Sequence, residues 1–204
     1  MRALLVVDLQ NDFMPGGLLP VAHGDETVDV ANSIMGGHFE FVVATQDWHP
    51  GDHSSFASNH PGTKPGDQAD VGGVTQTLWP DHCVQRTPGA SFHSSLDVAR
   101  IMHVVRKGVD MDIDSYSGFF DNRHARDTGL SVYLRSRGVT EVWIAGLATD
   151  YCVKYTALDA RALGLATAIV LDGCRGIDLN PGDVDAALAE MRVAGCEIVT
   201  SSEA

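Results

Sequence analysis

Five consecutive apolar residues near the start of the chain, Ala3-Leu4-Leu5-Val6-Val7, indicate how this protein folds. The run is continuously apolar, whereas a strand with one solvated face alternates apolar and polar residues. Continuous runs are typical of strands buried on both faces, as in a parallel sheet that helices cover on either side. The first strand therefore predicts an α/β architecture.

Five further apolar segments repeat this pattern, and segments with helical periodicity separate most of them. The expected strands cover residues 3–7, 39–44, 101–105, 142–145, 168–171 and 197–199. The expected helices cover residues 25–35, 128–137, 150–163 and 181–194. Alternating strands and helices predict one doubly wound, six-stranded parallel sheet with helices on both faces and a ligand site at the carboxyl ends of the strands.

The composition is that of an acidic globular protein. The 204 residues include 14 Lys plus Arg and 27 Asp plus Glu, which gives a formal net charge of −13. This length suits a single domain, spanning residues 1–204, with a sizeable core. An acidic surface repels phosphate backbones and anionic lipids, so we expect neither a nucleic-acid partner nor a membrane partner. No apolar run approaches the roughly 20 residues that cross a bilayer.

The expected compartment follows from the first residues and the cysteines. Asp8 interrupts the apolar start before a secretion signal of about 7–15 apolar residues can form. Cys83, Cys152, Cys174 and Cys196 lie far apart without a C-x-x-C pair, which favours reduced thiols over a disulfide framework. We therefore expect a soluble cytoplasmic protein, and the sequence leaves open whether it forms a homo-oligomer.

Cys152 is the strongest candidate for a nucleophile. The segment Gly146–Cys152 joins an expected strand to an expected helix, and Thr149 or Asp150 can cap that helix. Cys152 would then lie in the first helical turn, where unpaired N–H groups and the helix dipole favour the thiolate over the thiol. The alternative is a small buried residue at a strand–helix junction.

A long loop at about residues 46–95 has the composition of a metal site. Asp47 and His49 stand two residues apart after the second expected strand, and further histidines follow in the same loop. Carboxylate and imidazole ligands suit zinc, iron or manganese, and an incomplete protein shell leaves positions for water or substrate. The alternative is that these histidines are exposed or only hydrogen-bonded.

A second loop contains Asp110-x-Asp112-x-Asp114, which imitates the opening of a calcium-binding loop. The sixth position is Ser115 where glycine is required, and the twelfth is Asp121 where glutamate is required. We therefore expect a solvated acidic loop. Asp8 and Lys107 each follow an expected strand, so both should emerge at the carboxyl edge of the sheet.

Five motifs occur together in one order along nearly the whole chain, and this combination resembles the nicotinamidase family of isochorismatase-like cysteine hydrolases. The motifs are Val6–Phe13, Thr45–Phe56, Trp79–Cys83, Lys107–Gly108 and Gly146–Val153. The resemblance implies a doubly wound, six-stranded isochorismatase-like fold. It implies an amidase that hydrolyses nicotinamide to nicotinate and ammonia through a cysteine thioester, within NAD salvage, and it extends to pyrazinamide as a further substrate.

The resemblance also implies roles for individual residues. Cys152 would be the nucleophile, Asp8 the general base and later acid, and Lys107 the cation that holds and tunes Asp8. Backbone N–H groups of Ala148 and Cys152 would form the oxyanion hole. A non-proline cis peptide is expected at Leu147–Ala148.

The implied cofactor is one divalent metal ion, zinc, iron or manganese. Asp47, His49 and His82 would bind it. Some members use the residue matching His53 as a ligand, whereas in others waters near the position of Ser55 complete the coordination shell of the metal. The walls of a pocket for a flat aromatic ring would be Phe13, Trp79, Tyr116 and Tyr151.

Two other readings remain. Within the superfamily, the alternatives are an N-carbamoyl amidase and an isochorismatase. An N-carbamoyl amidase would not explain the metal-ligand composition of the Asp-x-His loop. An isochorismatase does not use a nucleophile in the position of Cys152. From a different class, the chain could be a non-catalytic metal or thiol sensor with Cys83 as the resolving cysteine.

Overall fold

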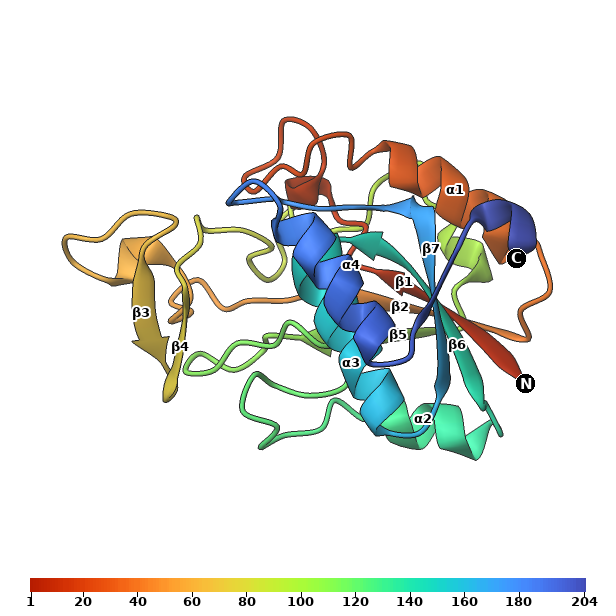
Figure 1. Ribbon diagram of the computed structural model, residues 1–204. Helices are drawn as coiled ribbons and strands as arrows, with labels where there is room; N and C mark the ends of the chain where they lie inside the picture. Colours follow the sequence, from red (N-terminus) through yellow and green to blue (C-terminus); the bar gives the residue numbers. More distant parts are fainter.

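The computed structural model describes residues 1–204 and contains a six-stranded parallel sheet with helices on both faces (Figure 1). From edge to edge the strands follow the order β5-β2-β1-β6-β7-β8. The predicted fold class is therefore confirmed. The strands of this sheet are β1 (Arg2–Val7), β2 (Phe41–Asp47), β5 (His103–Lys107), β6 (Glu141–Leu147), β7 (Ala166–Arg175) and β8 (Glu197–Val199).

Helices enclose the sheet from two sides. One face is covered by α1 (Glu26–Met35), and the other by α2 (Leu130–Ser136), α3 (Lys154–Ala162) and α4 (Asp183–Val193) (Figure 1). Within β1, residues 3, 5 and 7 pack into the core beneath α2, α3 and α4, while residues 4 and 6 pack into the core beneath α1. This burial on both faces explains why the strand is apolar without alternation. None of the four helices has the length and hydropathy needed to cross a membrane.

The order of the strands creates a crevice at one edge of the sheet. The chain moves from β1 through β2 to β5, then crosses to the other side of β1 and continues through β6, β7 and β8. The crossovers that leave the adjacent strands β1 and β6 therefore run in opposite directions. Ligands of such sheets bind where the direction reverses, outside the carboxyl ends of these strands. Asp8 follows β1, and Cys152 follows β6.

The loop of about residues 46–95 has more structure than the sequence predicts. Its antiparallel hairpin, β3 (Gln68–Val71) and β4 (Val74–Thr77), projects from the main sheet and carries a small core of Ala57, Val71 and Leu78 (Figure 1). Short 3₁₀ turns occur at Asn11–Phe13, Ala57–Asn59, Val98–Arg100 and Ser201–Glu203. At the main sheet, β2 continues to Asp47 and β5 ends on Lys107, so both side chains lie at strand ends rather than beyond them.

A close approach of two backbones at Gly146 provides a test of this arrangement. Gly146 pairs with Val7, has φ +130°, and a Cβ added there would lie 2.1 Å from the Val7 carbonyl oxygen. We expect Gly146→Ala to lower the free energy of unfolding in urea by at least about 2 kcal/mol more than Gly164→Ala, because overpacking adds to backbone strain. Gly164 is the matched control, since it has φ +84° and open space. Equal losses in the two variants would contradict the close approach.

Candidate active site

Three side chains that are far apart in the sequence meet at the carboxyl edge of the sheet. Lys107 Nζ lies 2.9 Å from Asp8 Oδ2 and 3.2 Å from Cys152 Sγ. The Cys152 sulfur and a carboxylate oxygen of Asp8 lie within 4.8 Å of each other. All three residues are buried, with exposed fractions of 0% for Asp8, 1% for Lys107 and 6% for Cys152. This is the arrangement needed for proton transfer between a thiol and a carboxylate beside a fixed cation.

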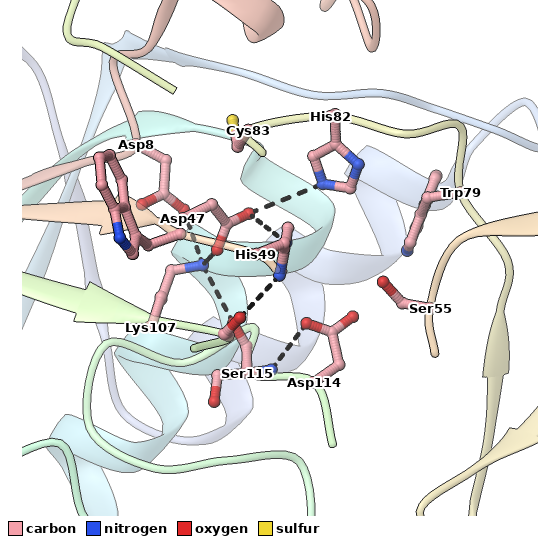
Figure 2. Close-up of polar contacts among 12 residues, drawn as sticks. Asp8, Asp47, His49, Ser55, Trp79, His82, Cys83, Lys107, Asp114 and Ser115 are labelled. Atoms are coloured by element: carbon pink, nitrogen blue, oxygen red, sulfur yellow. Dashed lines mark hydrogen bonds and ion pairs between the residues drawn. The ribbon is translucent and has the colours of Figure 1, made fainter. Parts of the chain in front are cut away.

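Lys107 also connects this group to Asp47, as Figure 2 shows. Its ammonium group donates hydrogen bonds to Asp47 Oδ1 at 2.5 Å, to the Ser115 carbonyl oxygen at 3.0 Å and to Cys152 Sγ. The resemblance implied that Lys107 holds Asp8, but not that it holds two carboxylates. A single buried cation therefore lies between the candidate nucleophile and the candidate metal ligands.

Burial changes the protonation of these groups. Burial raises the pKa of the Asp8 carboxyl, although the Lys107 charge opposes the change. Burial alone would lower the pKa of Lys107, but Asp47 and Asp8 raise it well above its usual value, so the amine stays charged. Burial also raises the pKa of the Cys152 thiol well above its usual value, against the opposing effect of Lys107. Burial therefore opposes the thiolate that the helix start and Lys107 favour at Cys152.

Cys152 lies in a single π-helical turn, Thr149–Val153, that leads directly into α3. The carbonyl oxygen of Ala148 accepts hydrogen bonds from the N–H groups of Tyr151 at 3.0 Å and Val153 at 3.1 Å. The peptide bond between Leu147 and Ala148 is cis, which confirms the expectation from the family resemblance. Ala148 and Cys152 line the same pocket.

Neither Thr149 nor Asp150 caps this helix, so that expectation is wrong. The Asp150 carboxylate accepts hydrogen bonds from the backbone N–H groups of Ile177 at 3.0 Å and Asp178 at 2.8 Å. Asp150 therefore fixes the loop after β7 against the turn that carries Cys152. The sequence alone does not show whether the Asp150 carboxylate caps its own helix or accepts hydrogen bonds from a distant backbone segment.

Asp47, His49 and His82 converge without hydrogen bonds among them. The Nε2 atoms of His49 and His82 lie 3.6 and 3.8 Å from Asp47 Oδ2 (Figure 2). Each histidine Nδ1 contacts a backbone carbonyl oxygen, that of Gly108 at 2.9 Å and that of Pro80 at 2.8 Å. Because a carbonyl only accepts, each Nδ1 carries a hydrogen, and the Nε2 that faces Asp47 is the atom that would bind a cation.

Three electron-pair donors that face one another fit a cation. Ligand atoms about 2.0–2.2 Å from a tetrahedral ion lie about 3.4 Å apart, close to the separations of the two histidines from Asp47. Backbone carbonyls that hold the outer nitrogens of metal-binding histidines are a common feature of such sites. The cluster Asp47, His49 and His82 is therefore a possible metal-binding site.

His53 lies beside this cluster but has different partners. Its Nδ1 is 2.7 Å from Ser55 Oγ, its Nε2 is 3.3 Å from the Ile113 carbonyl oxygen, and burial lowers its pKa to about 4. His53 groups with His49 and Asp114, not with Asp47 and His82.

Asp114 is not part of a solvated loop, so the expectation for this residue is wrong. It is 3% exposed, and its carboxylate accepts hydrogen bonds from the Ser115 N–H at 2.7 Å and from Gln76 Nε2 at 3.0 Å. Asp114 lines the candidate pocket. The partner from the unpredicted β4 strand explains why the sequence did not reveal this burial.

The four aromatic residues expected at the substrate pocket all line one cavity next to Cys152. Trp79 Nε1 donates a hydrogen bond to the Tyr116 hydroxyl at 3.0 Å, and the rings of Trp79 and Tyr151 meet edge to face at 4.9 Å. Its lining also includes two apolar residues that the sequence did not single out, Leu19 and Ile177.

The loop after β1 holds the backbone of two candidate metal ligands. Gln10 Oε1 accepts the Asp47 N–H at 2.8 Å, and Gln10 Nε2 donates to the Asp47 carbonyl oxygen at 2.8 Å. Asp12 Oδ2 accepts the N–H of Cys83, the residue after His82, at 2.7 Å. Gln10 and Asp12 were quoted in a motif but given no role. Their signal was the alternation of polar residues directly after a buried strand.

Thr45 performs a similar function for Asp8. Its hydroxyl donates a hydrogen bond to Asp8 Oδ1 at 2.6 Å and accepts one from the Asp8 N–H at 3.2 Å. Thr45 lies in β2, which pairs with β1, and is fully buried. A buried threonine in an apolar strand was the available signal, but only the pairing of the two strands reveals its partner.

Known proteins resemble this chain in sequence and in fold. The isochorismatase domain model matches residues 2–203. The chain is 48% identical to a nicotinamidase of Escherichia coli over 99% of this chain and 96% of the relative. It superposes on the structure of a nicotinamidase pyrazinamidase of Acinetobacter baumanii with a TM-score of 0.95 and 44% identity, over 99% of this chain and 97% of the other.

A structure with a bound metal is also similar. The pyrazinamidase of Pyrococcus horikoshii in complex with zinc matches with a TM-score of 0.77 and 39% identity, over 98% of both chains. The family match extends over nearly the entire sequence, and the relatives match it from end to end. This chain therefore belongs to the isochorismatase family.

Proposed function

We propose that this chain is a nicotinamidase that hydrolyses nicotinamide to nicotinate and ammonia through a cysteine thioester. The observation that carries the proposal is the contact of Lys107 with both Asp8 and Cys152 beside an aromatic pocket. The full-length similarity to the nicotinamidase of Escherichia coli supports the substrate. The similarity to the enzymes of Acinetobacter baumanii and Pyrococcus horikoshii supports pyrazinamide as a second substrate.

A primary carboxamide is a poor electrophile, so the site must create a strong nucleophile and protonate the departing nitrogen. Asp8 takes the proton of the Cys152 thiol, and the sulfur attacks the amide carbon. Negative charge then develops on the amide oxygen, which backbone N–H groups of Ala148 and Cys152 stabilise. Protonated Asp8 gives its proton to the nitrogen, ammonia leaves, and a thioester remains. Asp8 then activates the water that hydrolyses the thioester and releases the carboxylic acid.

The electrostatic environment suits this sequence of steps. An exposed aspartate is a weak base for a thiol, and burial raises the pKa of Asp8, which makes it a stronger base. Burial raises the pKa of the Cys152 thiol as well, so the transfer also depends on the Lys107 charge beside the sulfur. Lys107 stays charged 3.2 Å from the sulfur and stabilises the thiolate as it forms. The neutral resting thiol thus becomes reactive only when its proton moves to Asp8.

Asp47, His49 and His82 are the proposed ligands of one divalent metal ion, with zinc, iron and manganese as the candidates. The Pyrococcus horikoshii pyrazinamidase, a similar protein with a zinc complex, supports a bound metal ion in this chain. When bound, the metal would anchor the pyridine nitrogen and withdraw electrons from the ring. We assign His53 to the support of His49 and the neighbouring loop, because both of its nitrogens have protein partners.

The wider role proposed for the chain is a hydrolase domain over residues 1–204 that returns nicotinamide to NAD salvage. We propose that it acts in the cytoplasm, since its four cysteines are free thiols.

Replacement of the nucleophile is the direct test of the function. We expect Cys152→Ala to lower the rate of ammonia release from nicotinamide by at least about 10³-fold, because no other buried thiol contacts Asp8 and Lys107. Ammonia is measured with a coupled dehydrogenase assay, and circular dichroism checks the fold. Cys196→Ala is the matched control, since Cys196 lies in the core and outside the pocket. Turnover by Cys152→Ala, or loss of turnover in the control, would refute the assignment.

Removal of a proposed ligand tests the metal site. We expect His49→Ala to weaken metal binding by more than about 100-fold, because only two of the three proposed protein ligands remain. The main kinetic effect should be a higher KM for nicotinamide. Metal content after dialysis is measured by elemental analysis, with chelator competition for the affinity. His60→Ala is the control from the same loop, since the His60 imidazole hydrogen-bonds the Ser54 carbonyl oxygen rather than a proposed ligand. Wild-type metal content in His49→Ala would defeat the ligand assignment.

A further inference from the structure

The two oxygens of the Asp8 carboxylate have different surroundings. Oδ1 accepts the hydrogen bond from the Thr45 hydroxyl at 2.6 Å. Oδ2 is buried, receives no hydrogen bond from a hydroxyl or backbone N–H group, and faces Lys107 Nζ at 2.9 Å. A hydroxyl therefore holds one oxygen of Asp8, and the ammonium charge holds the other.

Lys107 is shared between Asp8 and several other partners. Its Nζ lies 2.9 Å from Asp8 Oδ2 and also donates to Asp47 Oδ1, the Ser115 carbonyl oxygen and Cys152 Sγ. The three hydrogens of an ammonium group cannot fully satisfy four acceptors, and a carboxylate oxygen has two lone-pair sites. Lys107 therefore holds Asp8 in place while Oδ2 retains a lone pair for a further proton.

The orientation of the Thr45 hydroxyl is determined on both sides. The Asp8 N–H donates to Thr45 Oγ1 at 3.2 Å, so the single hydroxyl hydrogen is directed to Asp8 Oδ1. Thr45 is 0% exposed in β2, where its β-branched side chain has few rotamers. The threonine therefore prevents the carboxylate from rotating and prevents Oδ1 from competing for another proton.

We propose that Thr45 is a positioning residue that directs the transferred proton to Asp8 Oδ2. In this step the S–H bond of Cys152 breaks, an O–H bond forms at Oδ2, and the electron pair stays on sulfur. The same oxygen then delivers the proton to the departing nitrogen, which restores the carboxylate. The inference rests on the proposed amidase function, because it assigns one atom to the acid–base step of that reaction.

Removal of the Thr45 hydroxyl should shift the pH dependence of kcat/KM in one direction. The hydrogen bond from Thr45 lowers the pKa of Asp8, against the larger effect of burial, which raises it. The charged or titratable groups that face Asp8 are Lys107 of β5, Asp47 of β2 and Cys152 of the π-helical turn, and none of them is changed by substitution at Thr45. Loss of the hydroxyl therefore raises the Asp8 pKa, and the acidic limb of kcat/KM, which requires ionised Asp8, moves to higher pH.

The test compares Thr45→Val, which keeps the shape and removes the hydroxyl, with Thr45→Ser, which retains it. We expect Thr45→Val to lower kcat about 10- to 100-fold, with KM within about twofold and the acidic limb at higher pH. Thr45→Ser should return kcat to within about threefold of the original protein. Thr27→Val is the matched control, since Thr27 is buried in α1 and its hydroxyl donates to the Gly24 carbonyl oxygen rather than to Asp8.

A second readout separates this inference from the proposed function. The rate of Cys152 alkylation by iodoacetamide, followed by mass spectrometry against pH, requires thiol deprotonation but no nicotinamide. Its acidic limb should move to higher pH in Thr45→Val and return in Thr45→Ser. If the unmodified protein releases no ammonia, the proposed function fails, while the alkylation profiles still decide on Thr45.

An unchanged kcat and unchanged profiles in Thr45→Val would overturn the inference, and so would a loss that Thr27→Val reproduces. Failure of Thr45→Ser to restore the rate would assign Thr45 a packing role only and would also overturn it. If Thr45→Val does not fold, Thr45→Ala removes the same hydroxyl with less crowding, and the same outcomes apply.

Discussion

The Lys107 ammonium group lies between two buried carboxylates. One is that of Asp8, directly after β1, and the other is that of Asp47, at the end of β2. The order β5-β2-β1 brings the three residues to one edge of the sheet, since adjacent strands are only about 4.8 Å apart. Without the cation, both carboxylates would be buried with like charge and no counter-ion, which typically destabilises a fold strongly. The same cation contacts the Cys152 sulfur. The protonation of the proposed nucleophile, the proposed base and a candidate metal ligand is therefore coupled through one residue.

The side chains around Lys107 are held mainly by backbone contacts. Gln10 fixes the Asp47 backbone, Asp12 fixes the segment of His82, and Asp150 fixes the loop opposite Cys152. These residues do not touch the sulfur or the proposed metal. They keep the reacting groups in place, which lowers the cost of reorganisation when charge develops in the transition state.

The fold was predictable because burial on both faces leaves a direct mark on the sequence, as in residues 3–7. The β3–β4 hairpin was missed because its short strands are mostly polar and its core is small. The residues Asp8, Lys107 and Cys152 could be found from motifs in order, whereas their contacts required the strand order. Spacing along the chain cannot show that Asp114 is buried, that Asp150 binds a distant loop, or that burial raises the pKa of the Cys152 thiol.

The order of these residues along the chain has a consequence during biosynthesis. Residues 47, 49, 82 and 107 leave the ribosome before residue 152, and β6 must insert beside β1 before the sulfur reaches its partners. A nascent polypeptide that has completed β5 therefore carries the histidines and both carboxylates but not Cys152. This sulfur joins the other groups only when the second half of the sheet forms, so a product truncated before β6 lacks the proposed nucleophile.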